Sequence, residues 1–291
     1  MNLPKNQVNN EMLPIIFIHK GDSSYLHYVL KCARIFNPYT RVILLGDESN
    51  RHYQSLDIEH FYFANFKGAE LELFDKVFKY IAGSQEPRGE WWVRIVFQRW
   101  FHMYYFIKSQ SIDKFWTFDS DTLILCDLSN QVSKFAGYDC TEQCNGMCMN
   151  GLINNAIVVK GYLDKINNLF QDEGYLNDLK VSFETQPTYA FTEMAAYFSY
   201  KDNSHIKTLR LNTIIDGESF DDCICQSHDT EMEKAVVLGQ NSEIKKLFFI
   251  NGYVYVKYLP TNSLIKMNTL NMSWVDDDVI EKVFNYVCGN L

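Results

Sequence analysis

The sequence predicts an α/β protein whose mixed central sheet is flanked by helices. Through residues 13–128, short apolar runs alternate with segments of helical periodicity, an order typical of a doubly wound, Rossmann-like sheet. Hydrophobic residues make up 47% of the 291 residues, enough to bury a substantial core. No linker rich in Pro, Gly or Ser interrupts the chain, so we expect a single domain over residues 1–291.

The N-terminal elements follow one another as strand–helix units. The apolar run LPIIFIH is followed by turn residues and a periodic segment, and Asn37-Pro38 ends that segment. Strands connected by helices run parallel, with right-handed crossovers. The elements expected in this half are strands at 13–19, 41–47 and 58–62, helices at 23–36, 68–82 and 90–108, and a strand at 114–121.

After residue 128 the pattern changes to mixed strands and short helices. The late run KKLFFINGYVYVKYLP has Asn251-Gly252 at its centre, the strongest short-range signal for a hairpin. We expect one continuous sheet through both halves. The other elements expected here are a strand at 151–160 and helices at 162–170 and 192–200.

Charge and targeting signals restrict the class of protein. With 27 basic against 36 acidic side chains, the net charge of −9 disfavours a protein that tracks along nucleic acid. The polar N-terminus lacks a signal-peptide core, and no run is long enough to span a bilayer. Eight cysteines without an export signal are typical of reduced thiols, so we expect a cytoplasmic protein. A peripheral contact with a membrane stays compatible with these features.

Polar side chains follow three of the predicted strands. Ligands of open parallel sheets bind beyond the carboxyl ends of the strands, so these side chains are the candidates for chemistry. The first strand is followed by His19, Lys20, Asp22 and Ser23, the second by Asp47, and the strand at 114–121 ends in Asp119, Ser120 and Asp121.

Asp119 and Asp121 are candidate ligands of Mn²⁺ or Mg²⁺. The two carboxylates are one residue apart in FWTFDSDTLIL, and no adjacent lysine or arginine neutralises them. These ions use one or two carboxylates and complete their shell with substrate phosphate oxygens, which suits a diphosphate leaving group. The alternative is that both residues end a strand in a solvated turn.

A second alternative is a haloacid-dehalogenase-like phosphohydrolase that uses Asp119 as its nucleophile. Four apolar or small residues followed by Asp-x-Asp-x-Thr match the nucleophile strand of that family. Such enzymes place this strand at the start of the core, whereas two strand–helix units precede it here. The pair Asp221-Asp222 is the candidate for the later metal motif.

The segment RWFHMYYFIKSQSIDKFWTFDSDTLIL resembles the helix and Asp-x-Asp strand of bacterial GT-A glycosyltransferases, and GLINNAIVVKGYLDKI is similar to their Asn-containing acceptor-side strand and next helix. The resemblance implies transfer from a nucleotide-sugar, most often a UDP-sugar, to a saccharide or glycolipid acceptor in polysaccharide biosynthesis. It further implies a donor-binding half at residues 13–128, an acceptor-binding half at 129–291, and Mn²⁺ or Mg²⁺ as cofactor.

The resemblance also implies roles for individual residues. Arg99, or else Arg94, faces the donor sugar, and Glu193 faces the acceptor, as general base in an inverting enzyme. Thr192 and Glu193 equally fit the start of a helix. The remaining donor contacts are His19, Lys20, Asp47 and Ser120.

Asn271 stands where many metal-dependent members carry a C-terminal histidine ligand. An asparagine binds Mn²⁺ or Mg²⁺ more weakly than a histidine, so a non-catalytic nucleotide-sugar-binding or glycan-binding homologue stays open. His102 and His205 read as structural and His228 as solvated.

Overall fold

The computed structural model describes residues 12–225, 231–236 and 243–289. Its centre is a seven-stranded mixed sheet, as predicted. Strands β3, β2, β1 and β4 run parallel, and β7 lies antiparallel beside β4. In spatial order the strands are β3 (Glu59–Tyr62), β2 (Val42–Gly46), β1 (Ile15–Ile18), β4 (Phe115–Thr117), β7 (Cys148–Ile153), β6 (Cys140–Gln143) and β8 (Thr208–Arg210).

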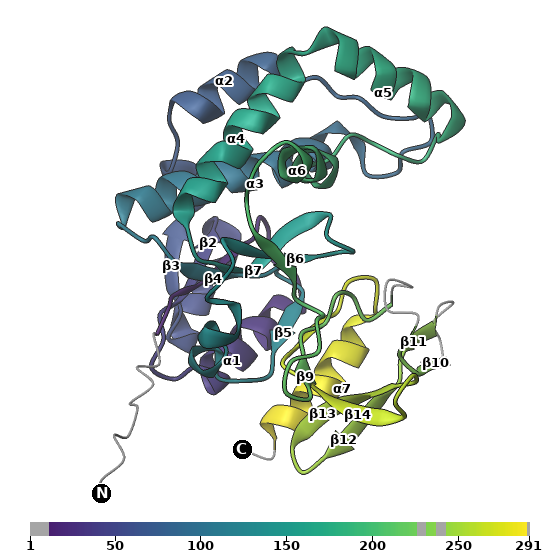
Figure 1. Ribbon diagram of the computed structural model, residues 1–291. Helices are drawn as coiled ribbons and strands as arrows, with labels where there is room; N and C mark the ends of the chain where they lie inside the picture. The colour runs from purple at the N-terminus through teal and green to yellow at the C-terminus, as the bar shows by residue number, and fades with distance from the viewer. Residues whose placement is uncertain (1–11, 226–230, 237–242, 290–291) are drawn as a thin grey trace, which may run out of the picture.

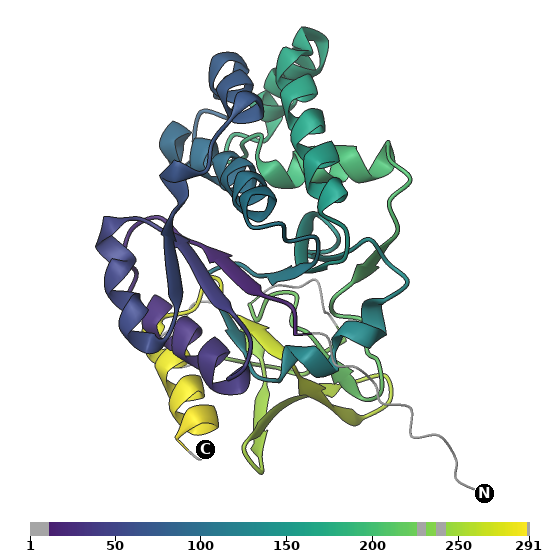
Figure 2. The ribbon, with the colours of Figure 1, turned by 90° about the vertical axis from the view of Figure 1, so that its left-hand side faces the viewer.

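Helices cover both faces of this sheet (Figures 1 and 2). The side chains of β1 alternate between the faces: Ile15 and Phe17 belong to the hydrophobic cluster with α1 and α7, and Ile16 to the cluster with α2 to α6. The helices are α1 (Leu26–Phe36) and α7 (Asp277–Cys288) on one face, and α2 (Ala69–Val77), α3 (Gly89–Ser109), α4 (Ala156–Gln171), α5 (Glu173–Thr185) and α6 (Glu193–Asp202) on the other.

The expectation of one continuous sheet is wrong. The C-terminal strands form a separate four-stranded sheet, β12-β13-β14-β9, beside α7 (Figure 1). Burial alternates along β13, so Val254 and Val256 face the cluster of α1 and α7 instead of extending the central sheet. These strands are β9 (Glu218–Ser219), β12 (Leu247–Ile250), β13 (Tyr253–Tyr258) and β14 (Ser263–Met267), and a two-stranded sheet joins β10 (Lys234–Val236) to β11 (Glu243–Lys245).

The predicted hairpin is confirmed. Strands β12 and β13 pair antiparallel up to Ile250 and Tyr253. Asn251 and Gly252 form the turn with φ of 51° and 80°, as a type I′ turn requires. The predicted helices at 162–170 and 192–200 are also present, inside α4 and at α6.

The predicted strand at 151–160 is only half right. Strand β7 ends at Ile153 and α4 begins at Ala156. The Asn155 side chain accepts a hydrogen bond from Ile157 N at 3.0 Å and caps the helix. The β-branched residues after it suit a strand locally, but Val158 and Val159 bury one helical face in the cluster of α3. Tertiary packing therefore overrides the local β-propensity.

The strand predicted at 114–121 is shorter in the structure, because β4 ends at Thr117, before the polar residues. β4 stays in the central sheet, whereas β5 (Thr122–Ile124) leaves it to pair antiparallel with β15 (Thr269–Asn271). Asp119, Ser120 and Asp121 form the connection, closed by Thr122 N donating to Asp119 O at 3.0 Å. Short 3₁₀ segments complete the fold: η1 (Glu48–Leu56), η2 (Phe63–Asn65), η3 (Leu128–Asn130) and η4 (Val132–Phe135).

Candidate active site

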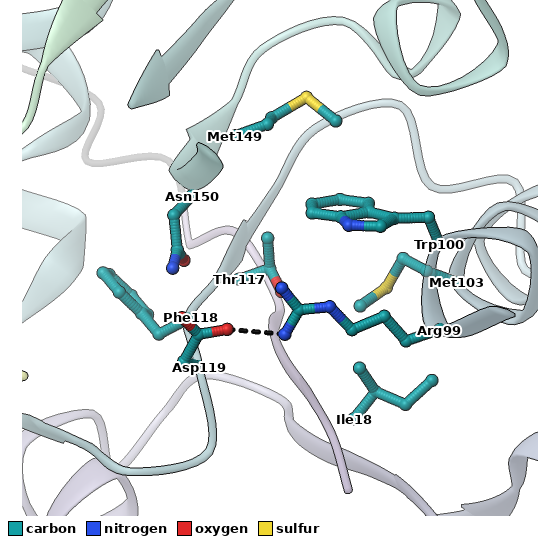
Figure 3. A pocket seen from close by; sticks show the side chains of 9 residues that line it. All are labelled: Ile18, Arg99, Trp100, Met103, Thr117, Phe118, Asp119, Met149 and Asn150. Atoms are coloured by element: carbon teal, nitrogen blue, oxygen red, sulfur yellow. Dashed lines mark hydrogen bonds and ion pairs between the residues drawn. The ribbon is translucent and has the colours of Figure 1, made fainter. Parts of the chain in front are cut away.

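A pocket opens at the carboxyl end of β4, under the inner face of α3. The space between its walls, including the solvent at its open mouth, is about 270 Å³. Figure 3 shows its walls, formed by Ile18, Arg99, Trp100, Met103, Thr117, Phe118, Asp119, Met149 and Asn150.

Arg99 joins two carboxylates that are far apart in sequence. Its Nη1 donates to Asp119 Oδ1 at 2.6 Å (Figure 3) and its Nη2 to Glu193 Oε1 at 3.0 Å. Burial acts to lower the pKa of Arg99, but the two carboxylates outweigh it and raise the pKa above its usual range. Arg94 instead pairs with Asp75 and Glu90 away from the pocket, so Arg99 is the arginine that faces the site.

Glu193 is the first residue of α6 and is only 6% exposed. The Tyr162 hydroxyl donates to its backbone carbonyl at 2.5 Å, which fixes the start of the helix beside α4. Its Oε2 is buried and accepts no hydrogen bond from the described residues. Burial raises the pKa of Glu193, Arg99 lowers it in part, and Asp119 raises it further. A carboxylate with a raised pKa and a free oxygen is suited to accept a proton.

Asp121 presents one satisfied and one unsatisfied carboxylate oxygen. Ser273 Oγ donates to Oδ2 at 2.7 Å, while Oδ1 is buried without a hydrogen-bond partner among the described residues. Burial and the neighbouring Asp119 charge raise the pKa of Asp121 to about 6, against the lowering effect of Ser273. The charged form of the Asp121 carboxylate is therefore disfavoured by its surroundings.

This arrangement fits a divalent cation that is shared with a ligand. A cation is the natural partner for a buried carboxylate oxygen next to a second carboxylate. Across the described ranges, no three His, Cys, Asp or Glu side chains are grouped to hold a metal ion by themselves. Asp119 and Asp121 would therefore hold it together with oxygens of a ligand.

His19 contacts the Asp-x-Asp connection directly. Its Nδ1 shares a hydrogen bond of 2.8 Å with Ser120 Oγ, and its Nε2 one of 3.2 Å with Ser23 Oγ. Burial lowers the pKa of His19, although Asp47 and Asp22 act to raise it, so the neutral ring is favoured. The structure thus brings His19 and Ser120 together, as expected for residues that follow two strands at the same edge of the sheet.

Asp47 and Lys20 also follow strands at this edge of the sheet. Asp47 is bonded to the neighbouring loops, whereas Lys20 is exposed. Asp47 Oδ2 accepts from Gly21 N at 2.8 Å and Oδ1 from Ser49 N at 2.9 Å, which ties the loops after β1 and β2 together. Burial acts to raise the pKa of Asp47, but these bonds lower it. The Lys20 side chain is exposed and lies over the exposed Trp91 ring, 4.9 Å from its centroid.

Asn271 is 1% exposed, and its Oδ1 accepts from Ser273 N at 3.0 Å. The structure brings Ser273, two residues later, into contact with Asp121. A metal-ligand role for Asn271 stays a prediction. Among the histidines named above, His102 bonds Phe66 O at 2.8 Å as a structural residue, and His228 lies outside the described residues.

The paired acids of the phosphohydrolase alternative are engaged elsewhere. Asp221 and Asp222 are both fully buried, in ion pairs with Lys245 and Arg210 respectively. Neither is available as the second acidic group that this alternative needs.

Sequence reasoning missed two contributors to the site. Ser273 follows β15 and approaches Asp121 only because β15 pairs with β5. Asn150 is 3% exposed and projects from β7 into the pocket (Figure 3). The sequence signal for Asn150 is the Asn150-Gly151 pair, because a glycine next to a polar residue at a strand indicates an unusual backbone position; the structure gives Gly151 a φ of 89°.

Comparisons with known proteins give distant structural likenesses. No protein-family model and no curated protein matches the sequence. The fold is similar to mouse xyloside xylosyltransferase 1 in its apo form, with a TM-score of 0.46 and 10% identity over 69% of this chain and 85% of that one. It is also similar to the PaToxG glycosyltransferase, with a TM-score of 0.37 and 12% identity over 60% of this chain and 67% of that one. Likenesses this distant carry no argument about activity.

Proposed function

We propose that the protein is a glycosyltransferase of the GT-A type that transfers a sugar from a nucleotide diphosphate donor, such as a UDP-sugar, to a saccharide or glycolipid hydroxyl. One observation carries the proposal. Asp119 and Asp121 follow the carboxyl end of β4, and Arg99, which lines the pocket together with Asp119, links Asp119 to the buried Glu193. A cytoplasmic location and a place in glycan assembly belong to the same proposal.

The chain's own residues divide the work at this site. Asp119 and Asp121 would hold Mn²⁺ or Mg²⁺, which supplies Lewis-acid stabilisation of the departing diphosphate. Arg99 fixes Asp119 and Glu193 and directs positive charge toward the pocket that holds the donor sugar. Glu193 takes the acceptor proton if the configuration inverts, and orients the sugar if it is retained. His19 and Ser120 fix the backbone of the connection.

The first test is Asp121→Asn, assayed for hydrolysis of or transfer from a panel of nucleotide-sugars with Mn²⁺. Activity should fall about 100-fold or more, because the metal's charge contributes several kcal/mol to the transition state. Asp113→Asn is the matched control, an exposed carboxylate just before β4. Unchanged metal-dependent activity in Asp121→Asn would contradict the metal role. A wild type that binds the donor but transfers it to no acceptor would favour a non-catalytic binding protein.

A further inference from the structure

A chain of hydrogen bonds runs from the C-terminal strands to the Asp121 carboxylate. Strand β15 ends at Asn271, whose Oδ1 accepts from Ser273 N at 3.0 Å and so bends the backbone after the strand. The bend brings Ser273 Oγ to Asp121 Oδ2 at 2.7 Å. A second contact, Met272 N to Asp121 O at 3.0 Å, holds the two segments in register.

The origin of this chain is a buried ion pair. Asp221 is 0% and Lys245 1% exposed, and they pair directly. Asp221 Oδ2 accepts from Asn271 N at 2.9 Å, and its backbone N donates to Thr269 Oγ1 at 3.1 Å. A charge-assisted bond to a backbone N–H in a dry interior is strong. The pair therefore fixes both ends of β15.

This anchoring bears on the orientation of the Asp121 carboxylate. The terminal torsion of an aspartate is soft, so a carboxylate beside another carboxylate can turn away from it. The Ser273 hydroxyl occupies Oδ2 and leaves Oδ1 as the buried oxygen without a partner among the described residues. The orientation of Asp121 thus depends on a residue from the far end of the chain.

We infer that Ser273 is a positioning residue for Asp121, and that Asn271 acts on the site by positioning Ser273. Asn271, which the sequence suggested as a metal ligand, instead accepts the hydrogen bond from Ser273 N and so fixes Ser273. The consequence for donor binding rests on the proposed function, whereas the consequence for the geometry of Asp121 does not.

Three variants test the inference by calorimetry with Mn²⁺ and UDP and by steady-state kinetics. Ser273→Ala should weaken Mn²⁺-dependent UDP binding about 10–100-fold, the usual effect of losing a hydrogen-bond partner of a metal ligand. Ser273→Thr keeps the hydroxyl and should restore most of the affinity. The control is Ser219→Ala, a 2% exposed serine whose hydroxyl donates to the Phe220 carbonyl at 3.1 Å. It should keep full affinity at a comparable melting temperature.

A double-mutant comparison separates positioning from direct coordination. If Asn271 acts through Ser273, then Asn271→Ala should weaken binding little further in a Ser273→Ala background. Additive losses, or full affinity in Ser273→Ala, would overturn the inference.

Crystal structures of the wild type and Ser273→Ala decide the geometry independently. A turned Asp121 carboxylate in Ser273→Ala supports the inference, and an unmoved one overturns it. If the wild type fails to bind UDP with Mn²⁺, the proposed function fails, while this structural comparison still decides the role of Ser273.

Discussion

At the scale of single residues, the site concentrates negative charge that Arg99 neutralises only in part. Arg99 is the one guanidinium against Asp119 and Glu193, and Asp121 has only the Ser273 hydroxyl, within the described part of the chain. Buried carboxylates with unsatisfied oxygens reduce stability unless a ligand completes them. Their persistence beside a pocket is typical of a functional site.

Glu193→Gln tests the role of the buried glutamate. Glutamine keeps a carbonyl oxygen for Arg99 but cannot accept a proton. If Glu193 is the general base, kcat should fall about 10²–10⁴-fold with little change in KM. Because the pKa of Glu193 is raised, the acidic limb of the wild-type rate profile should lie above the ordinary range of a glutamate. Glu184→Gln, at an exposed position of α5, serves as the control. A Gln variant that keeps full kcat would assign Glu193 to orientation only.

At the scale of elements, two polar pairs divide apolar runs that look continuous. Asp119 to Asp121 separates β4 from β5, and Asn154-Asn155 separates β7 from α4. The Asn154 amide donates to the carbonyls of Phe135 and Tyr138 at 3.0 and 2.9 Å, so the chain is held at the break. Each pair sits where the polypeptide changes direction, but the two lie at opposite ends of the sheet: Asp119 and Asp121 follow the carboxyl end of β4, whereas Asn154-Asn155 follow Ile153, which pairs with Phe115 at the start of β4.

Asn155→Ala tests the helix start. Losing the bond to Ile157 N should lower the free energy of unfolding by roughly 0.5–2 kcal/mol. Denaturant titration measures the loss, and Asn155→Asp should recover most of it because aspartate is an equally good cap. Asn168→Ala, exposed in the middle of the same helix, should change stability much less. Equal effects of the two alanine variants would contradict the capping role.

At the scale of the whole molecule, a polar network joins the C-terminal four-stranded sheet to the 3₁₀ segment η4. Glu218 of β9 accepts from Lys134 of η4 at 2.8 Å and from Lys266 of β14 at 2.9 Å. Burial acts to raise the pKa of Glu218, but the two lysines lower it to about 2. The carboxylate therefore has a lower pKa folded than unfolded, and its charged form stabilises the fold.

The pH dependence of this network can be predicted with its sign. A pKa lowered from 4.5 to about 2 sets an upper bound of roughly 3 kcal/mol on the stability from this charge, which solvent screening of the part-exposed carboxylate reduces; the contribution is present above pH 4.5 and lost as pH falls toward 2. Glu218→Gln should therefore destabilise at pH 7 by an amount that shrinks to near zero at pH 2. Thermal unfolding across this range measures it, with the exposed Glu243→Gln as control. A pH-independent loss would show that packing, not charge, accounts for the effect.

Within the described ranges, no helix is both long and apolar enough to cross a membrane.

The sequence by itself determined the strand–helix order of the first half, the hairpin at Asn251-Gly252 and the cluster of polar residues after β1, β2 and β4. These depend on local periodicity and turn chemistry, which neighbouring residues carry. Only the tertiary structure decided that Arg99 rather than Arg94 meets Glu193, that the C-terminal strands form their own sheet, and that Ser273 reaches Asp121. The physical reason is distance along the chain: which buried faces and polar partners meet across 94 or 152 residues is set by packing of the whole molecule.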